Sequence, residues 1–133
     1  MKKKLITAVA TMAMLFTMGT NAFAATTSIS FPASNVKGDL SSVEDTDKFT
    51  FVTPTGTARA ITYKLEGPSD QTYKISVYRT SDNKPLGSVI QGVKGYVKLE
   101  ANTAYYLYVS AFSAADYDED SDSHDYYITA TLN

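Results

Sequence analysis

The densest group of chemically active side chains lies between residues 116 and 125. Around Glu119 and the chain's one histidine, His124, stand the carboxylates Asp116, Asp118, Asp120, Asp122 and Asp125. Like charges this close repel one another, and a hard cation with oxygen ligands, such as Ca²⁺, would balance them. The run is not an EF-hand, because Ser121 stands at the glycine position and Tyr127 at the bidentate glutamate position. The sequence therefore predicts either a calcium-binding loop or a mobile, solvated loop between two strands.

A second acidic group, Glu44, Asp45 and Asp47, precedes a predicted strand that begins near Lys48. In an extended segment Asp45 and Asp47 lie on one face, whereas Glu44 points elsewhere. A simple interpretation is that Asp47 accepts hydrogen bonds from the amides of a turn. The sequence leaves open whether the two acidic groups meet at one end of the molecule.

Tyrosine is the most frequent aromatic residue, with ten copies. Four tyrosines alternate in phase with aliphatic residues and are predicted to be core residues: Tyr63, Tyr73, Tyr105 and Tyr126. Tyrosines on the opposite phase are candidate ligand-binding residues: Tyr78, Tyr96, Tyr106 and Tyr108. If their face meets solvent, Tyr106 and Tyr108 form an aromatic strip suited to stacking on sugar rings or on proline-rich, collagen-like chains. The alternative is that this face is covered, or that tyrosine simply suits strands.

Catalysis finds little support. The chain has no cysteine, and we find no Gly-x-Ser-x-Gly elbow, HExxH pair or phosphate-binding glycine loop. Ser121, Ser123, His124 and Asp125 are neighbours in one loop, whereas the members of a catalytic triad normally come from separate elements. Because no pair among the 14 carboxylates stands out, a small carboxylate-dependent hydrolase is the least favoured function. We predict that the protein is not an enzyme.

The elements that must position these residues are predicted to be strands, because the dominant apolar period is two. The predicted strands are residues 48–51, 61–66, 73–77, 97–99, 105–110 and 126–132, with shorter ones at 28–31, 36–40 and 86–90. Turn signals rich in proline, glycine and asparagine separate them, at 53–56, 67–70, 81–85 and 91–92. Eight or nine closely spaced strands without helices predict an all-β fold, an antiparallel, jelly-roll-like β-sandwich.

The first 24 residues have the features of a signal peptide. Lys2, Lys3 and Lys4 precede an apolar stretch, and Ala22-Phe23-Ala24 offers small residues to a signal peptidase, which we expect to cut after Ala24. The mature chain, residues 25–133, is then a single secreted, extracellular domain. Without the three lysines, nine of the 12 basic residues remain against 14 acidic ones, a net charge of −5. Such a charge disfavours nucleic acids and anionic membranes as partners.

Several segments together carry a family resemblance. They are Gly38-Asp39-Leu40 with the acidic stretch and aromatic strand that follow it up to Phe51, then residues 73–78, 99–109 and 125–128. In this order they resemble the bacterial pre-peptidase C-terminal domain. The resemblance covers residues 34–133, with Asn102 where the family often has glycine. The family usually accompanies secreted proteases, and this chain contains no protease.

The resemblance implies a calcium-responsive sandwich that, in some clostridial collagenase relatives, binds collagen. It also implies that the region of Glu44, Asp45 and Asp47 binds calcium or orders the first turn. We therefore predict a secreted, non-catalytic binding or accessory domain for an extracellular polymer or protein, with Ca²⁺ as its cofactor. The alternative is a structural or protease-inhibitory extracellular protein that makes its contacts through sheet edges.

Overall fold

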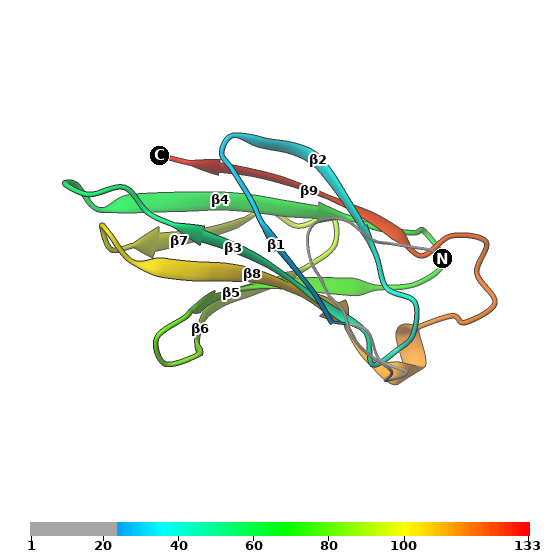
Figure 1. Cartoon of the computed structure of the whole chain (residues 1–133). Helices are drawn as coiled ribbons and strands as arrows, with labels where there is room; N and C mark the ends of the chain where they lie inside the picture. The colour runs from blue at the N-terminus through cyan, green and yellow to red at the C-terminus, as the bar shows by residue number, and fades with distance from the viewer. Residues whose placement is uncertain (1–23) are drawn as a thin grey trace.

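The structure, a computed structural model, describes residues 24–133. The predicted signal peptide, residues 1–24, therefore lies outside the described residues except for Ala24. Within the described range the chain forms nine strands and one short 3₁₀ helix (Figure 1): β1 (Ala24–Ser28), β2 (Ala33–Asp39), β3 (Thr46–Val52), β4 (Arg59–Glu66), β5 (Tyr73–Arg79), β6 (Lys84–Ile90), β7 (Gly95–Leu99), β8 (Ala104–Ala111), η1 (Ala114–Asp116) and β9 (Asp125–Leu132).

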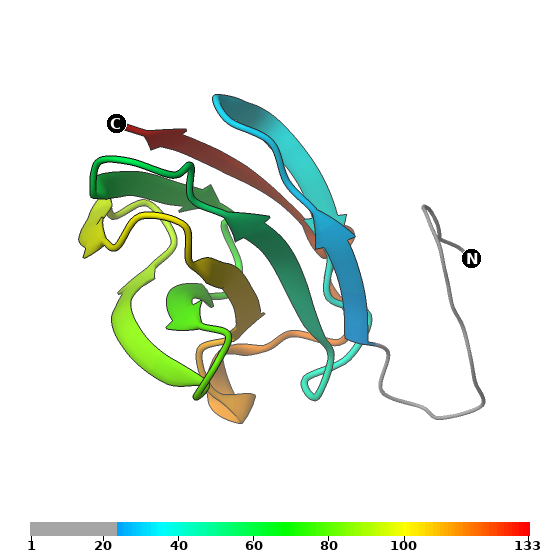
Figure 2. The ribbon, with the colours of Figure 1, turned by 60° about the vertical axis from the view of Figure 1, so that its left-hand side comes forward.

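The strands form two sheets, one in front of the other (Figure 2). One has the order β1-β3-β8-β5-β6 and the other β2-β9-β4-β7. The predicted all-β sandwich is confirmed. One pairing differs from the prediction, because β1 runs parallel to β3 while the remaining pairs in both sheets are antiparallel. The reason lies in the connection: β1 and β2 follow each other in the chain but belong to different sheets, so no hairpin fixes the direction of β1.

The first strand also lies earlier than its apolar pattern predicts. Residues 28–31 were expected to be a strand, yet β1 ends at Ser28 and the chain then crosses to the other sheet. Ile29 and Phe31 instead fill the side of the sandwich at this crossing, where Phe31 packs edge-on against Phe51 with ring centroids 4.9 Å apart. Their alternating pattern reflects burial in a connection, because burial and not strand pairing selects apolar residues.

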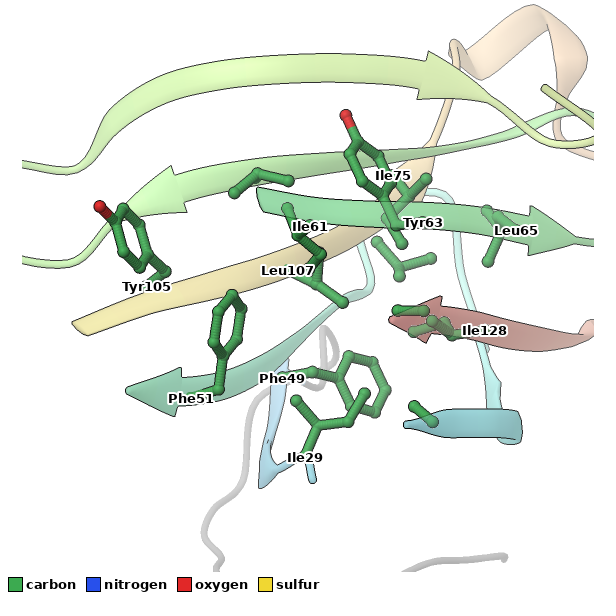
Figure 3. Packing of buried hydrophobic residues seen from close by; sticks show 14 of the residues in the cluster. Ile29, Phe49, Phe51, Ile61, Tyr63, Leu65, Ile75, Tyr105, Leu107 and Ile128 are labelled. Carbon is green, nitrogen blue, oxygen red and sulfur yellow. The ribbon is translucent and has the colours of Figure 1, made fainter. Parts of the chain in front are cut away.

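The core lies between the two sheets and consists of every second side chain of the paired strands (Figure 3). On β3, Phe49 and Phe51 point inward while Lys48 and Thr50 point outward. The four tyrosines predicted to be core residues are all buried: Tyr63, Tyr73, Tyr105 and Tyr126. The period-two prediction is therefore confirmed for the core, and removal of these side chains from water supplies the main favourable term in folding.

Two glycines make room for two of these rings. A Cβ atom at Gly95 would overlap the ring of Tyr63, and one at Gly38 would overlap the ring of Tyr126. Three hydroxyl groups also find partners: the Tyr105 hydroxyl accepts from the Glu100 amide at 2.8 Å, the Tyr73 hydroxyl donates to the His124 carbonyl at 3.2 Å, and the Tyr126 hydroxyl donates to Asp47. Buried tyrosine is stable under these two conditions, space for the ring and a partner for the hydroxyl.

Candidate functional site

Three tyrosines gather on the outer side of the five-stranded sheet, opposite the core. Tyr78 on β5 pairs with Tyr106 on β8, and Tyr108 follows two residues later on the same face. The rings of Tyr78 and Tyr106 are stacked with centroids 5.2 Å apart, and Tyr108 meets Tyr78 edge-on at 5.6 Å. We call Tyr78, Tyr106 and Tyr108 the tyrosine face. It is a preformed aromatic cluster that the core does not require.

Two polar residues flank the tyrosine face. The Lys48 ammonium lies 4.7 Å from the centroid of the Tyr106 ring, a cation–π contact, and the Tyr106 hydroxyl donates to Asn83 Oδ1 at 2.8 Å. Burial, followed by the neighbouring tyrosines, raises the pKa of Tyr106, so its hydroxyl is a hydrogen-bond donor at neutral pH. The face therefore combines ring surfaces with a cation and an amide.

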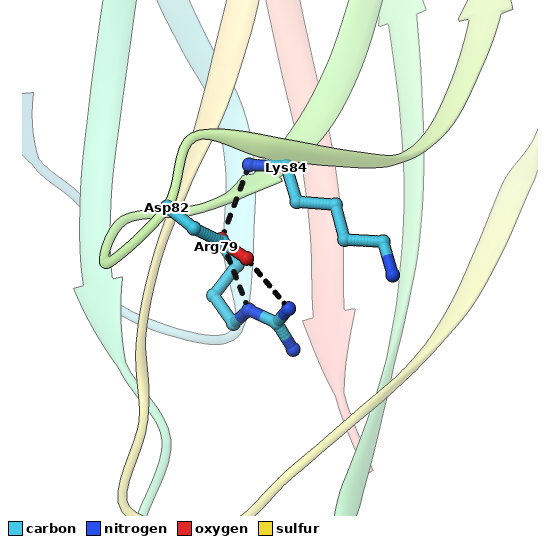
Figure 4. A network of polar contacts seen from close by, with 3 residues as sticks. All are labelled: Arg79, Asp82 and Lys84. Carbon is cyan, nitrogen blue, oxygen red and sulfur yellow. Dashed lines mark hydrogen bonds and ion pairs between the residues drawn. The ribbon is translucent and has the colours of Figure 1, made fainter.

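The position of Asn83 depends on a turn between β5 and β6. The Arg79 guanidinium donates to both Asp82 carboxylate oxygens at 3.1 and 2.8 Å, and the Lys84 amide donates to Asp82 Oδ1 at 3.2 Å (Figure 4). Asn83 itself has φ of 53°, a left-handed conformation that asparagine tolerates. A charged turn thus holds one end of the tyrosine face.

For Tyr106 the structure agrees with the alternative of a covered face, since this residue is only 6% exposed. Tyr78 covers one side of its ring and the Lys48 ammonium also lies against it, so the accessible surface belongs to the half-buried Tyr78 and Tyr108. Tyr96 is 61% exposed but lies on β7 of the other sheet. The structure therefore brings together three of the four predicted ligand-binding residues.

The two acidic groups meet at one end of the sandwich. Leu40, which precedes the first group, donates its amide to the His124 carbonyl at 3.2 Å. The Tyr117 hydroxyl donates to the Leu40 carbonyl at 2.8 Å, and the Tyr117 ring stacks on His124 with centroids 5.2 Å apart. Aromatic stacking and neutral hydrogen bonds therefore anchor the loop of residues 116–125 to the first turn.

The acidic side chains of this loop mostly face solvent and serve as local hydrogen-bond acceptors. Asp116 accepts from the Ser113 hydroxyl, Asp118 accepts from the Asp120 amide, and Asp125 pairs with Lys37 at 3.4 Å. The exposed members are Asp116, Glu119, Asp120 and Asp122. Across residues 24–133, no three carboxylate, histidine or cysteine side chains are placed together as metal ligands. Calcium binding by the loop stays a prediction.

The first acidic group is arranged differently. Asp45 and Asp47 are 3% and 5% exposed, whereas Glu44 is exposed, as the alternation predicts. Asp45 Oδ2 accepts from the amide and hydroxyl of Ser41, while Asp45 Oδ1 has no hydrogen-bond partner. Asp47 Oδ2 accepts from the hydroxyl of Tyr126. Two carboxylates thus lie inside the protein.

Burial is the main cause of the raised pKa values of Asp45 and Asp47. It raises the pKa of Asp45 from 3.8 to about 6, against the opposing effect of the Ser41 hydrogen bonds. It also raises the pKa of Asp47 well above its usual range, and the neighbouring charge of Asp45 adds to the effect. Removing a carboxylate from water disfavours its charged form, and two carboxylates close together oppose each other's ionisation.

The loop residues that resemble a triad do not form one. His124 Nδ1 lies 3.3 Å from the Gln71 side-chain amide, and the Ser121 hydroxyl has two acceptors within reach, an Asp70 carboxylate oxygen at 3.1 Å and the Ser123 carbonyl at 2.9 Å. The Ser123 hydroxyl accepts from the Asp125 amide. Each group is therefore used in the local structure of the loop.

Sequence reasoning missed the partners that complete both sites. Tyr126 is separated by 79 residues from Asp47, and Lys48 meets Tyr106 only because β3 pairs with β8. Gly38 leaves space for the Tyr126 ring, but their pairing follows from the register of β2 and β9 and gives no signal in the sequence. No signal in the sequence identified Lys48 or Asn83.

Comparisons with known proteins support the fold. No family model matches the chain, and no curated protein sequence matches it. Aeromonas hydrophila PliG, a periplasmic lysozyme inhibitor of g-type lysozyme, is similar in structure, with a TM-score of 0.64, 17% identity, and coverage of 83% of this chain and 97% of PliG. The pre-peptidase C-terminal domain of collagenase from Bacillus anthracis is similar with a TM-score of 0.59, 17% identity, and coverage of 86% and 100%.

At this level of identity the likeness concerns the fold. The chain has the same sandwich fold as the pre-peptidase C-terminal domain, so the resemblance seen in the sequence is confirmed in three dimensions. Among residues 24–133, no helix is long and apolar enough to cross a membrane.

Proposed function

We propose that the protein is a non-catalytic binding domain that works outside the cytoplasm, and that it binds an extracellular protein through the tyrosine face. The observation that carries this proposal is the packed cluster of Tyr78, Tyr106 and Tyr108 on the side of the sheet opposite the core. Nothing in the packing between the sheets needs three aromatic rings at these positions. Aromatic rings gathered on the face opposite the core suggest a role in recognition.

The composition of the face favours a protein partner. Tyrosine is enriched in protein interfaces because it offers a large, rigid contact area and a hydroxyl group for hydrogen bonding. The mutual packing of the three rings fixes them before binding, which reduces the entropy lost on association. Lys48 and Asn83 at the margin can pair with acidic groups and backbone amides of the partner.

The names of the two structural neighbours agree with this proposal. One is a periplasmic inhibitor of g-type lysozyme, and the other is a domain of a collagenase. Both come from proteins that work beyond the cytoplasm or on extracellular material. The predicted signal peptide would deliver the present chain to the same side of the membrane.

A binding assay with matched variants tests the proposal. Residues 25–133 are incubated with insoluble collagen, with chitin and with cell-wall material, and the retained fraction is measured. We expect Tyr78→Ala with Tyr108→Ala to reduce retention on collagen by at least about tenfold, because buried interface tyrosines often contribute more than 1.4 kcal/mol each. The control is Tyr96→Ala with Tyr127→Ala, which removes exposed tyrosines from the other sheet.

Equal retention of the two double variants would exclude the tyrosine face. Retention on chitin or cell wall but not on collagen would point to a polysaccharide partner and would overturn the protein partner. Each double variant must also unfold at a midpoint close to that of the parent, so that a loss of binding cannot be attributed to a loss of folding.

A second candidate function is inhibition of a secreted enzyme through a sheet edge. It is favoured by the fold shared with a lysozyme inhibitor and by Tyr96, which is exposed on the edge strand β7. An assay of lysozyme inhibition separates the two candidates. Inhibition that Tyr96→Ala abolishes and Tyr108→Ala preserves would support the edge.

A further inference from the structure

The nitrogen of Ala25 lies beside a buried carboxylate. Ala25 on β1 is the register partner of Asp47 on β3, and its amide donates to Asp47 Oδ1 at 3.4 Å. This nitrogen belongs to the peptide bond that the predicted signal peptidase would cut, since the sequence Ala22-Phe23-Ala24 places the cut after Ala24. The predicted cleavage site and the contact with Asp47 thus involve the same atom, the nitrogen of Ala25.

Asp47 is short of positive charge where it lies. Asp47 is 5% exposed, and among residues 24–133 the groups that act on its carboxylate are the Tyr126 hydroxyl, the Ala25 amide and the carboxylates of Asp45 and Asp39. The ion pairs within residues 24–133 join Lys37 to Asp125, Lys64 to Glu66 and Arg79 to Asp82. None of them includes Asp47. A buried carboxylate is normally paired with a cation or fully hydrogen-bonded.

We propose that removal of the signal peptide creates the missing counter-ion: the new α-ammonium group of Ala25 forms an ion pair with the Asp47 carboxylate. Hydrolysis consumes one water molecule. The Ala24 carbonyl leaves with the signal peptide as a carboxylate, and the Ala25 nitrogen becomes an amine that takes up a proton at neutral pH. The atom that was a neutral donor is then a positively charged donor at the same place.

This ion pair couples processing to stability. Hydrogen bonds in which both partners are charged are shorter and stronger than neutral ones. A positive charge beside Asp47 also offsets the repulsion among Asp39, Asp45 and Asp47. The bond fastens β1, an edge strand, to β3. The chain that begins at Ala25 is therefore expected to be more stable than a chain with residues added before Ala25.

A double-mutant cycle in EDTA tests the inference, with EDTA present so that metal ions cannot replace the amine. Four proteins are compared: residues 25–133, the same chain preceded by Ser-Gly, and both with Asp47→Asn. We expect the extension to lower the unfolding midpoint by about 5 °C in the parent and by less than a third of that with Asp47→Asn. An equal loss in both backgrounds would overturn the ion pair.

A second measurement does not depend on the folding of the Asp47→Asn variant. The α-amine of residues 25–133 is labelled with an amine-reactive ester at fixed pH and followed by peptide mass spectrometry. We expect it to react at least about tenfold more slowly than the amine of the Ser-Gly chain, because ion pairing removes the free amine that reacts. Equal rates would contradict the inference. So would a secreted protein whose first residue, found by mass spectrometry, is not Ala25.

Discussion

Two acidic regions lie at the same end of the sandwich and differ in nearly every physical respect. The region of Glu44 to Asp47 places two carboxylates inside the protein, whereas the loop from Asp116 to Asp125 keeps most of its carboxylates in water. In the sequence the loop has the larger number of carboxylates, six against three, and attracts attention first. In the structure the shorter region carries the larger electrostatic cost.

Burial explains the difference. A solvated carboxylate interacts weakly with its neighbours because water screens the charges, so the loop can hold many at little cost. A carboxylate removed from water loses the stabilisation that hydration gave to its charge, and hydrogen bonds from the protein must replace it. At Asp45 they replace only part of that stabilisation, because the Oδ1 atom has no hydrogen-bond partner. The number of charges in a stretch therefore says less than where each side chain points.

The largest expected effect concerns pH and Asp45. Its pKa in the folded protein is about 6, above the 3.8 of an unperturbed group, so between these values the folded state binds more protons than the unfolded state. The contribution of Asp45 to stability is therefore fully present below about pH 4 and is lost as the pH rises through 6. The shift corresponds to on the order of 3 kcal/mol.

Urea unfolding of the parent and of Asp45→Asn at pH 4.5 and pH 7 measures this effect. The amide cannot ionise, so the parent should lose stability relative to Asp45→Asn between the two pH values. The Ser-Gly extended chain should show the larger loss, because it lacks the ammonium group proposed for Ala25. A constant difference between parent and variant would mean that Asp45 is not buried as described.

The next effect in size concerns the hydroxyl of Tyr126. Tyr126→Phe keeps the ring that packs against Phe49 and Tyr73 but leaves Asp47 Oδ2 without its donor. Leaving a buried polar atom unsatisfied costs about 1–3 kcal/mol, and we expect about 2 kcal/mol of unfolding free energy to be lost.

Tyr127→Phe is the matched control, one residue away and pointing to solvent. It should change the unfolding free energy by less than about 0.5 kcal/mol. If the two variants behaved alike, the contrast between a costly interior and a tolerant surface would fail at this end of the sandwich.

The sequence predicted the layers well because they depend on a local property. An alternation of apolar and polar residues is visible within one strand, as at Phe49 and Phe51, and it determines which face is buried. The direction of β1 was not predictable in this way. It depends on where the chain crosses between sheets, and the segment at Ile29 and Phe31 has the same pattern as a strand.

The candidate sites were predicted only in part, because the sequence shows the phase of each strand and not the contacts between strands. Phase put four tyrosines on outward-facing positions: Tyr78, Tyr96, Tyr106 and Tyr108. Strand order then decides that Tyr78 joins Tyr106 and Tyr108 while Tyr96 lies on the other sheet, and Lys48 reaches Tyr106 from the neighbouring strand. Likewise the phase of Asp45 and Asp47 was correct, but the partner Tyr126 lies far along the chain. Properties of one strand can be read from the sequence, and contacts between strands require the register of the sheets.

The smallest expected effect concerns the loop. Asp118→Asn with Asp120→Asn removes two charges but keeps the oxygen at Asp118 that accepts from the amide of residue 120. In the presence of a chelator we expect the unfolding free energy to change by less than about 0.5 kcal/mol, because the contacts that anchor the loop come from Tyr117 and His124.

The same variant tests the predicted calcium site. A loop that binds calcium at five times its dissociation constant would gain about 1 kcal/mol, seen as a higher unfolding midpoint of the parent with calcium than with chelator. The double variant should lose that gain, while Asp45→Asn should keep it if the loop alone holds the ion. If Asp45→Asn loses the calcium-dependent gain and the loop variant keeps it, the calcium site lies in the buried region instead. If the parent shows no gain, neither region binds calcium. The buried carboxylates would then need another counter-charge, for which the amino group of Ala25 is in position.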